Sequence, residues 1–219
     1  MDLTLWQATA GPDGRCYPGG AKGGADGTSA SENGDIGRGN AARSHLGRRI
    51  CRCPVVRWCW PNARQYFESM PDFTLAFGGA AFAHQEAHCT ENFSGAALWL
   101  PPGVHPNEEA VGEIVENTVA PSIRADLYTM LERMASYHPG EPHWYLPMIG
   151  VDPAHQGHGH GAALLEYALE RCDRDGCCAY LESTNPRNIT LYQRHGFEVL
   201  GEIQVGTSPP MVPMLRTRR

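Results

Sequence analysis

A glycine-rich turn at residues 156–161 constrains the fold of this chain more than any other feature of its sequence. The mostly apolar run from His143 to Val151 ends at Asp152 and Pro153, and the turn Gln-Gly-His-Gly-His-Gly then leads directly into Ala-Ala-Leu-Leu. A strand, a tight turn and the start of a helix are therefore expected in succession. Glycine at every second position leaves the backbone bare, so that a ligand can approach it closely. The first turn of a helix adds unpaired N–H groups and a partial positive charge, so the segment predicts a phosphate cradle built from backbone amides.

Two widespread phosphate-binding patterns fit this turn poorly. The P-loop needs Gly-Lys-Ser/Thr at its end, and Gly161 is instead followed by two alanines, which excludes it. The dinucleotide pattern G-x-G-x-x-G/A is met by Gly157, Gly159 and Ala162, and Glu182 stands where a ribose-binding acid would be expected. That pattern normally opens a sheet of about six strands, whereas only 58 residues follow Gly161.

A third pattern, V-x-P-x-x-Q/R-G-x-G-x-G/A, fits residues 151–161 at every defined position. It is the pyrophosphate loop of the GNAT family of N-acetyltransferases. Residues 185–198, with Asn-Pro-Arg-Asn, then Leu-Tyr and Gly-Phe, resemble the second signature of that family. The segments 97–103 and 141–146 resemble a common bacterial branch of it. The resemblance covers roughly residues 54–215, and by its two signatures in order the chain is identified as a member of the GNAT family, of bacterial type.

This resemblance implies a mixed α/β fold, with a mostly antiparallel central sheet flanked by helices. It implies acetyl-CoA as co-substrate and direct attack by a primary amine of a small molecule or a peptide. The backbone from Met148 through Ile149 and Gly150 to Val151 would pair with the pantetheine arm, which resembles a β-strand. Asn188 would hydrogen-bond the same arm, with a helix cap as its alternative role. The pyrophosphate would be held by the amides of Gln156, Gly157, His158, Gly159, His160 and Gly161.

Two side chains are candidates for the proton transfers of this reaction. Tyr192 stands where the family keeps its general acid, which protonates the departing thiolate; an aromatic ring packed on the sheet is the alternative. Glu182 lies on a strand beside the cleft and would act as the base through water, with an exposed or ribose-facing carboxylate as the alternative. Glu113 and His143 are further candidates for the base. An amide near Ile149 is the expected donor to the oxyanion.

Composition excludes several other classes of function. A net charge of −6 and a pI of about 5.9 do not favour nucleic acid as a partner. No apolar run approaches the ~20 residues of a membrane span, and the N-terminus lacks the pattern of a secretory signal. A cytoplasmic monomer or homodimer that does not bind membranes is therefore expected. A non-catalytic module that holds acyl-CoA is the competing class of function.

The eight cysteines lack the paired CxxC spacing of zinc sites. Without an export signal, reduced thiols are expected. The three histidines 155, 158 and 160 sit on the glycine turn, whose backbone already has a role, so no metal site is predicted.

Residues 11–53 differ in composition from the rest of the chain. Glycine occurs 11 times between Gly11 and Gly47, and no helical period is present. Such a segment cannot bury enough apolar surface to offset its ordering entropy, so it is expected to be mobile. Either it is a disordered insertion, or the reading frame is wrong here and recovers near Pro54. On either hypothesis a possible first strand occupies residues 1–10, and the GNAT domain occupies residues 54–219.

Periodicity predicts the remaining elements. In residues 122–137 apolar side chains recur at steps of three and four, which indicates one apolar helix face that serves as core, as a roof over the amine site, or as both. A short helix is expected to begin in residues 58–67. The other expected helices are 107–118, the one from the glycine turn to about 173, and 188–195. The expected strands are 3–7, 73–83, 87–100, 143–151, 177–183, 197–205 and 210–216.

Overall fold

The computed structural model describes residues 8–10, 16–18, 52–90 and 93–218. Strands β1 (Ala8–Ala10) and β2 (Cys16–Pro18) pair antiparallel in a separate two-stranded sheet. The expected strand at residues 3–7, and the predictions of mobility or of a frame error for residues 11–53, concern residues that lie almost entirely outside this described part.

A six-stranded sheet forms the centre of the molecule, in the order β3-β4-β5-β6-β8-β7. Strands β5 and β6 are parallel, and every other neighbouring pair is antiparallel. The expectation of a mixed, mostly antiparallel sheet flanked by helices is therefore confirmed. The strands are β3 (Ala87–Cys89), β4 (Gly95–Leu100), β5 (His143–Val151), β6 (Cys178–Ser183), β7 (Glu198–Val199) and β8 (Val212–Arg216).

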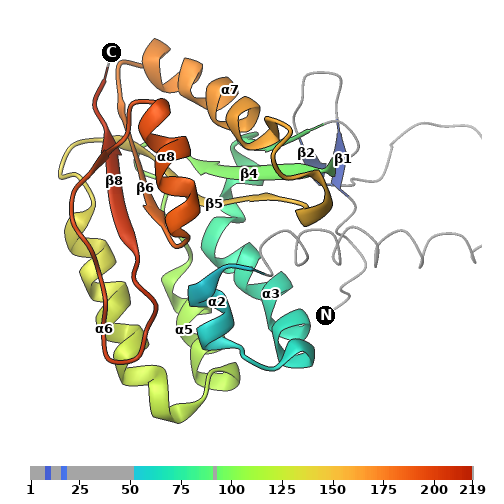
Figure 1. The fold of residues 1–219 in the computed structure, drawn as a ribbon, viewed down its shortest axis with the longest axis vertical. Coiled ribbons are helices and arrows are strands. Elements are labelled where there is room, and N and C mark those ends of the chain that lie inside the picture. Colours follow the sequence, from blue (N-terminus) through green and yellow to red (C-terminus); the bar gives the residue numbers. More distant parts are fainter. Residues whose placement is uncertain (1–7, 11–15, 19–51, 91–92, 219) are drawn as a thin grey trace, which may run out of the picture.

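Helices cover both faces of this sheet. In Figure 1, α7 (His160–Arg174) lies above β4 and β5, whereas α2 (Pro54–Cys59), α5 (Glu108–Thr118) and α6 (Pro121–Tyr137) lie below them. The short helix α8 (Pro186–Arg194) follows β6. None of the helices in the described part of the chain is long and apolar enough to span a membrane.

Alternate side chains of strand β4 point to opposite faces of the sheet and pack in two different hydrophobic clusters. Ala97 and Trp99 pack in the cluster that contains the apolar face of α7, whereas Leu98 and Leu100 pack in a cluster with residues near α3 and α4. All six residues of β4 are buried, as expected for a strand covered on both faces. A third cluster lies among α2, α3, α5 and α6 and contains the buried residues of the apolar face of α6.

The two parallel strands separate part-way along the sheet. The pairing of β5 with β6 ends at Leu146 opposite Leu181. Strand β5 then continues to Val151 paired only with β4, and β6 continues to Ser183 paired with β8. Pro147, the first residue beyond the last pair, cannot donate a backbone hydrogen bond. The β6-facing edge of β5 is therefore released from the ladder over residues 147–151.

Residues 73–83 are helical, so the strand expected there is wrong. Helix α3 (Ala63–Gly78) runs almost directly into α4 (Ala80–Ala83). Asn62 caps α3 by accepting hydrogen bonds from two backbone amides, and Phe73 stacks on Phe77 one turn later with ring centroids 5.3 Å apart. A Cβ at Gly78 would lie 2.8 Å from Leu98 Cδ1. The small residues there allow a helix to pack closely on the sheet rather than weakening a strand.

Three smaller predictions also need correction. The helix expected from residue 58 is divided, because α2 ends at Cys59 and α3 begins only after Asn62. Residues 87–100 form two strands, β3 and β4, which pair with each other. The closing strand expected over 197–205 is reduced to β7 and an isolated bridge between Ile203 and Met211.

Candidate active site

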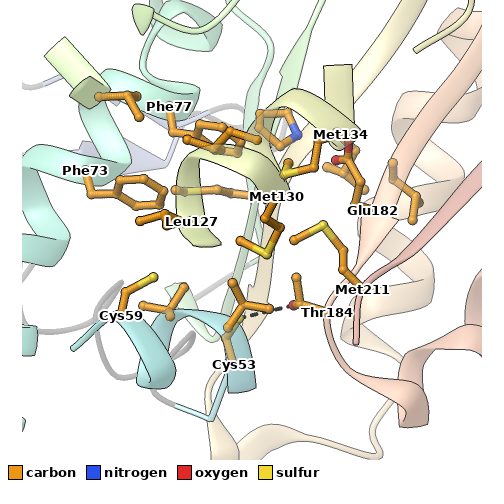
Figure 2. A pocket seen from close by; sticks show the side chains of 18 of the residues that line it. Cys53, Cys59, Phe73, Phe77, Leu127, Met130, Met134, Glu182, Thr184 and Met211 are labelled. Carbon is orange, nitrogen blue, oxygen red and sulfur yellow. Dashed lines mark hydrogen bonds between the residues drawn. The ribbon is translucent and has the colours of Figure 1, made fainter. Parts of the chain in front are cut away.

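A cavity of about 140 Å³ lies where β5 and β6 separate. Its walls come from α2, α3, α5 and α6, from the two strands, and from α8. Figure 2 shows labelled side chains of α2, α3, α6 and β6 around it. The apolar face predicted for α6 contributes Leu127, Met130, Leu131 and Met134, so this face belongs both to a core and to a cavity wall.

Five residues predicted from the sequence line this cavity together. They come from three elements and are Met148, Ile149, Glu182, Asn188 and Tyr192. Gly150 and Val151 continue β5 away from the cavity lining, and residues 156–161 follow at the end of that strand. Glu113 is exposed on α5 and does not line the cavity.

The glycine turn has the backbone geometry of a cradle. Gly157 and Gly159 have φ values of 80° and 83°, in the left-handed region that favours glycine, and Gly159 caps α7. A Cβ at either position would meet no atom within 4 Å, so packing does not require glycine there. The first hydrogen bond of α7 runs from the Ala163 amide to the Gly159 carbonyl. The amides of residues 160–162 therefore have no partner within the helix.

Side chains hold this turn in place. Asp152 accepts a hydrogen bond from the Ala154 amide at 2.9 Å, at the start of the 3₁₀ turn η2 (Pro153–His155). Gln156 Nε2 donates to the Val151 carbonyl at 3.1 Å, and His158 Nδ1 donates to the Gln156 carbonyl at 2.9 Å. These contacts use the Ala154 amide and two carbonyls, and they leave the amides at the start of α7 available.

Glu182 is the charged group of the cavity lining. Its side chain is only 4% exposed. Tyr145 donates its hydroxyl hydrogen bond to Glu182 Oε2 at 2.9 Å. Burial, and then the negative charge of Glu182, raise the pKa of Tyr145 well above its usual value, so the phenol remains a donor. Among the described residues Glu182 Oε1 has no hydrogen-bond partner, although His138 Nε2 lies 3.5 Å away.

Two histidines extend from this carboxylate toward the surface. His143 Nδ1 donates to the Glu141 carbonyl at 2.9 Å, so in the neutral ring its Nε2 accepts. His138 Nδ1 lies 3.0 Å from that Nε2 and donates to it. The Nε2 of His138, which faces Glu182, therefore carries a proton only when this ring is cationic. Burial lowers the pKa of His143, and the positive charges of His138 and His105 lower it further.

Tyr192 and Asn188 lie on one face of α8, one turn apart. Tyr192 is 4% exposed. Its burial raises the pKa of Tyr192 to about 12, and the hydrogen bond with Asn188 opposes this rise. The ring also packs edge-on against Phe197 with centroids 6.1 Å apart. The surroundings therefore accommodate both interpretations of this residue, a protonated donor and a packed aromatic ring.

The sequence did not indicate His138 and Tyr145, which contact Glu182, or Cys53, which lines the cavity. The Cys53 thiol hydrogen-bonds the Thr184 hydroxyl at 3.1 Å, and Figure 2 marks this contact. Among the described residues, five cysteines are free thiols and Cys89 is disulfide-bonded, so the expectation of reduced thiols is wrong for Cys89. In the described ranges no group of three or more His, Cys, Asp or Glu side chains is arranged to hold a metal ion.

The family model described as Acetyltransferase (GNAT) family matches residues 105–197. That range contains α5, α6, β5, the glycine turn and Tyr192. Over these residues the chain is similar to the GNAT acetyltransferase family. This confirms the family inferred from the two signatures. The more specific assignment to a bacterial branch is not supported, because similar proteins come from a fungus and from a bacterium.

Two curated relatives show how far this chain resembles known sequences. An uncharacterised N-acetyltransferase from Schizosaccharomyces pombe is 34% identical over 71 residues, which is 32% of this chain and 29% of that protein. An acetyltransferase from Agrobacterium fabrum is 31% identical over 75 residues, 34% of this chain and 55% of that protein. The chain thus spans less than a third of the length of the first relative and about half of the length of the second.

Solved structures resemble this chain over most of its length. A Corynebacterium glutamicum structure described as histone acetyltransferase HPA2 and related acetyltransferase has a TM-score of 0.56 at 22% identity, over 82% of this chain and 91% of that one. Arylalkylamine N-acetyltransferase 2 from Aedes aegypti has a TM-score of 0.54 at 13% identity, over 82% and 94%. At such identities these similarities establish the fold alone.

Proposed function

We propose that this chain transfers the acetyl group of acetyl-CoA to a primary amine by direct attack. One observation carries the proposal: a cavity opens where β5 and β6 separate, and the glycine cradle stands at the end of the same β5. A thioester whose phosphates lie on the cradle and whose arm follows the free edge of β5 would bring its acetyl group to this cavity. Similarity to the GNAT family supports acetyl-CoA as the donor.

The residues of the chain fit this donor. Residues 156–161 offer backbone amides at a helix start, where the partial positive charge favours phosphate. The released edge of β5 over residues 147–151 offers unpaired backbone groups to the amide-containing arm. Asn188 lies in the cavity wall beside this edge and is placed to hydrogen-bond the arm. Acetyl-CoA, when bound, supplies an acetyl group already activated as a thioester.

Proton transfer is assigned to two side chains. The amine must lose a proton before or during attack, and the buried Glu182 carboxylate accepts it, directly or through water. A backbone amide near Ile149 stabilises the negative charge that develops on the acetyl oxygen. Tyr192 then gives its phenolic proton to the leaving sulfur. Its pKa of about 12 keeps this proton in place at neutral pH until it is needed.

A non-catalytic acyl-CoA-binding module is the second candidate, because Tyr192 and Glu182 also have purely structural contacts. The two candidates are separated by measuring CoA release from acetyl-CoA with a panel of primary amines, alongside CoA binding by calorimetry. We expect amine-dependent release that exceeds hydrolysis. CoA binding without release for any amine would favour the binding module.

The same proposal covers the organisation of the chain. We assign the acetyltransferase domain to residues 54–219, acting as a monomer or homodimer in the cytoplasm, without nucleic acid, membrane or metal as a partner. The described part of the domain includes the cradle, the released edge of β5 and the cavity, so it holds every group that the mechanism uses.

A further inference from the structure

The cavity walls have an unusual chemistry for an enzyme that takes a charged substrate. Among the described residues, Glu182 is the only charged one that lines the cavity. Other polar groups are confined to Thr184, Asn188 and Tyr192, all on or just after β6 and on α8. The helices opposite contribute only apolar and sulfur-containing side chains, which are Val55, Val56, Cys59, Phe73, Phe77, Val111, Val115, Leu127, Met130, Leu131 and Met134.

These walls restrict the body of the acceptor. A second ammonium group, a sugar hydroxyl or a peptide backbone would lose its water on entry and find no partner on the helices. Burying such a group without a hydrogen bond is costly, and burying an unpaired charge is much more so. Polyamines, amino sugars and lysine peptides are therefore poorly matched to the helical side of the cavity.

Size restricts the acceptor further. The cavity volume of about 140 Å³ is close to the roughly 150 Å³ of an apolar protein cavity that binds one benzene molecule. Such a space holds at most one six-membered ring or a short alkyl chain, because the acetyl group of the donor enters the same cavity. Met130, Met134 and Met211 line it, and the flexible thioether chains of methionine adapt to differently shaped apolar groups.

Glu182 supplies the complement to an ammonium group. Its Oε2 is already occupied by the Tyr145 hydroxyl at 2.9 Å. Its Oε1 makes no hydrogen bond among the described residues and lies 3.5 Å from His138 Nε2, and the Glu182 side chain lines the cavity at 4% exposure. A buried carboxylate is costly unless a cation is paired with it. An ammonium has three N–H donors and no acceptor, so it suits this carboxylate.

We propose that the acceptor is a primary monoamine with an apolar body of about one ring, such as a phenylalkylamine or a short alkylamine. Its ammonium group pairs with the Glu182 carboxylate, and its body lies among Phe77, Leu127 and Met130. This inference rests on the proposed function, since the bound amine is the group that attacks the acetyl thioester. It names the acceptor class by the chemistry of the cavity.

An amine panel tests the inference directly. The full chain is assayed for CoA release with 2-phenylethylamine and hexylamine against spermidine, glucosamine and a lysine-containing peptide. We expect kcat/KM for the two apolar monoamines to exceed that of the other three by about 100-fold or more, because a buried unpaired charge costs at least that. Comparable or higher kcat/KM for spermidine, glucosamine or the peptide would overturn the inference and leave the acetyltransferase proposal intact.

Binding provides a readout that does not depend on turnover. Calorimetry with 2-phenylethylamine, in the presence of saturating CoA, should show binding that Glu182→Gln weakens by about tenfold or more, since the ammonium then loses its paired charge. Binding without CoA release would support the acceptor class while contradicting the proposed catalysis. No binding of either apolar monoamine would overturn the inference.

A change in cavity size tests where the body lies. Met130→Ala removes a side chain from the wall and lengthens the space. The ratio of kcat/KM for 4-phenylbutylamine to kcat/KM for 2-phenylethylamine should then rise by about tenfold, because one or two additional methylenes in an apolar pocket change kcat/KM by about that factor. Met134→Ala is a second variant of the same kind, and unchanged CoA affinity shows that each variant is folded. Glu132→Ala, at an exposed position of the same helix, is the matched control. An unchanged ratio in both folded methionine variants would place the acceptor elsewhere.

Discussion

At the scale of single residues, Tyr192 is the sharpest test of the proposed chemistry. Tyr192→Phe removes the hydroxyl and keeps the ring that packs against Phe197. Loss of a general acid should slow turnover by about 10²–10⁴-fold, while CoA affinity changes much less. Rapid-quench or steady-state assays under conditions where chemistry limits the rate provide the measurement. Turnover within about threefold of wild type would mean that the thiolate leaves unassisted or takes its proton from water, and that Tyr192 serves as packing.

His143 carries a prediction about stability and pH. Burial holds its pKa in the folded protein below the value of about 6.5 that it has when unfolded. Below that pH the unfolded chain binds more protons than the folded one, so the free energy of unfolding falls as pH falls. The contribution of His143 is fully present above pH ~6.5 and is lost as the pH drops through its folded pKa. His143→Asn should therefore flatten the fall in Tm between pH ~7.5 and ~5.5.

The control for this experiment is His84→Asn, at an exposed position after α4. It should leave the slope of Tm against pH as it is in the wild type. Only the difference in slope is informative, because removing His143 also removes its hydrogen bonds to His138 and to the Glu141 carbonyl. An identical slope in His143→Asn would show that this ring does not couple folding to pH.

At the scale of elements, the unit formed by β5, the glycine turn and α7 predicts where phosphate binds. Gly159→Asp places a side chain at a φ of 83° and a negative charge beside the proposed phosphate site. We expect the Kd for CoA to rise by about tenfold or more, since like charges at short range cost over 1 kcal/mol even near the surface. Calorimetry measures the change.

The chain offers a matched control for that substitution. Gly176 also has a positive φ, of 62°, and a Cβ there meets no atom within 4 Å, but it follows the opposite end of α7. Gly176→Asp introduces the same side chain and comparable backbone strain away from the cradle. It should lower stability as Gly159→Asp does and leave CoA affinity unchanged. Equal CoA affinity in the two folded variants would place the phosphate site elsewhere.

Elements with strong local signals were predictable from the sequence. Strand β5 has the bounds expected for it, because a Pro-containing turn ends its apolar run. Helix α6 differs by a single residue at its start, since its apolar spacing is regular and proline stands at its first turn. Residues 73–83 were assigned wrongly because their small and aromatic side chains have no clear period. The close approach of Gly78 to Leu98 of the sheet is a tertiary contact that this local sequence does not indicate.

In the candidate site too, residues in short motifs were predictable from the sequence, and residues brought together only by the fold were not. Tyr192, Asn188 and the cradle stand in short motifs and were found from them. The contact between Tyr145 and Glu182 joins residues 37 positions apart on neighbouring strands, and His138 approaches both from the end of α6. Such contacts depend on strand register and on the angle at which a helix crosses the sheet. No local pattern in the sequence carries that information.

At the scale of the whole molecule, the cavity exists because β5 and β6 do not pair along their full length. Hydrophobic clusters cover both faces of the sheet, and the cavity lies where β5 separates from β6. The donor would contact the cradle, the edge of β5 and α8 together, so its binding should stabilise the native state as a unit. A ligand that binds only the folded state at 100 times its Kd adds about 2.7 kcal/mol to the free energy of unfolding.

For a chain of this size, 1 kcal/mol corresponds to a rise in Tm of roughly 2–4 °C, so saturating CoA should raise Tm by about 5–10 °C. Adenosine, which lacks the phosphates and the pantetheine arm, should give almost no shift, because it engages neither the cradle nor β5. NAD⁺ has a pyrophosphate but no arm to follow the released strand edge, so it should shift Tm less than CoA. A shift with NAD⁺ equal to that with CoA would mean that the cradle alone holds the ligand, and the dinucleotide pattern met by Gly157, Gly159 and Ala162 would then describe this site better than the acetyl-CoA assignment does.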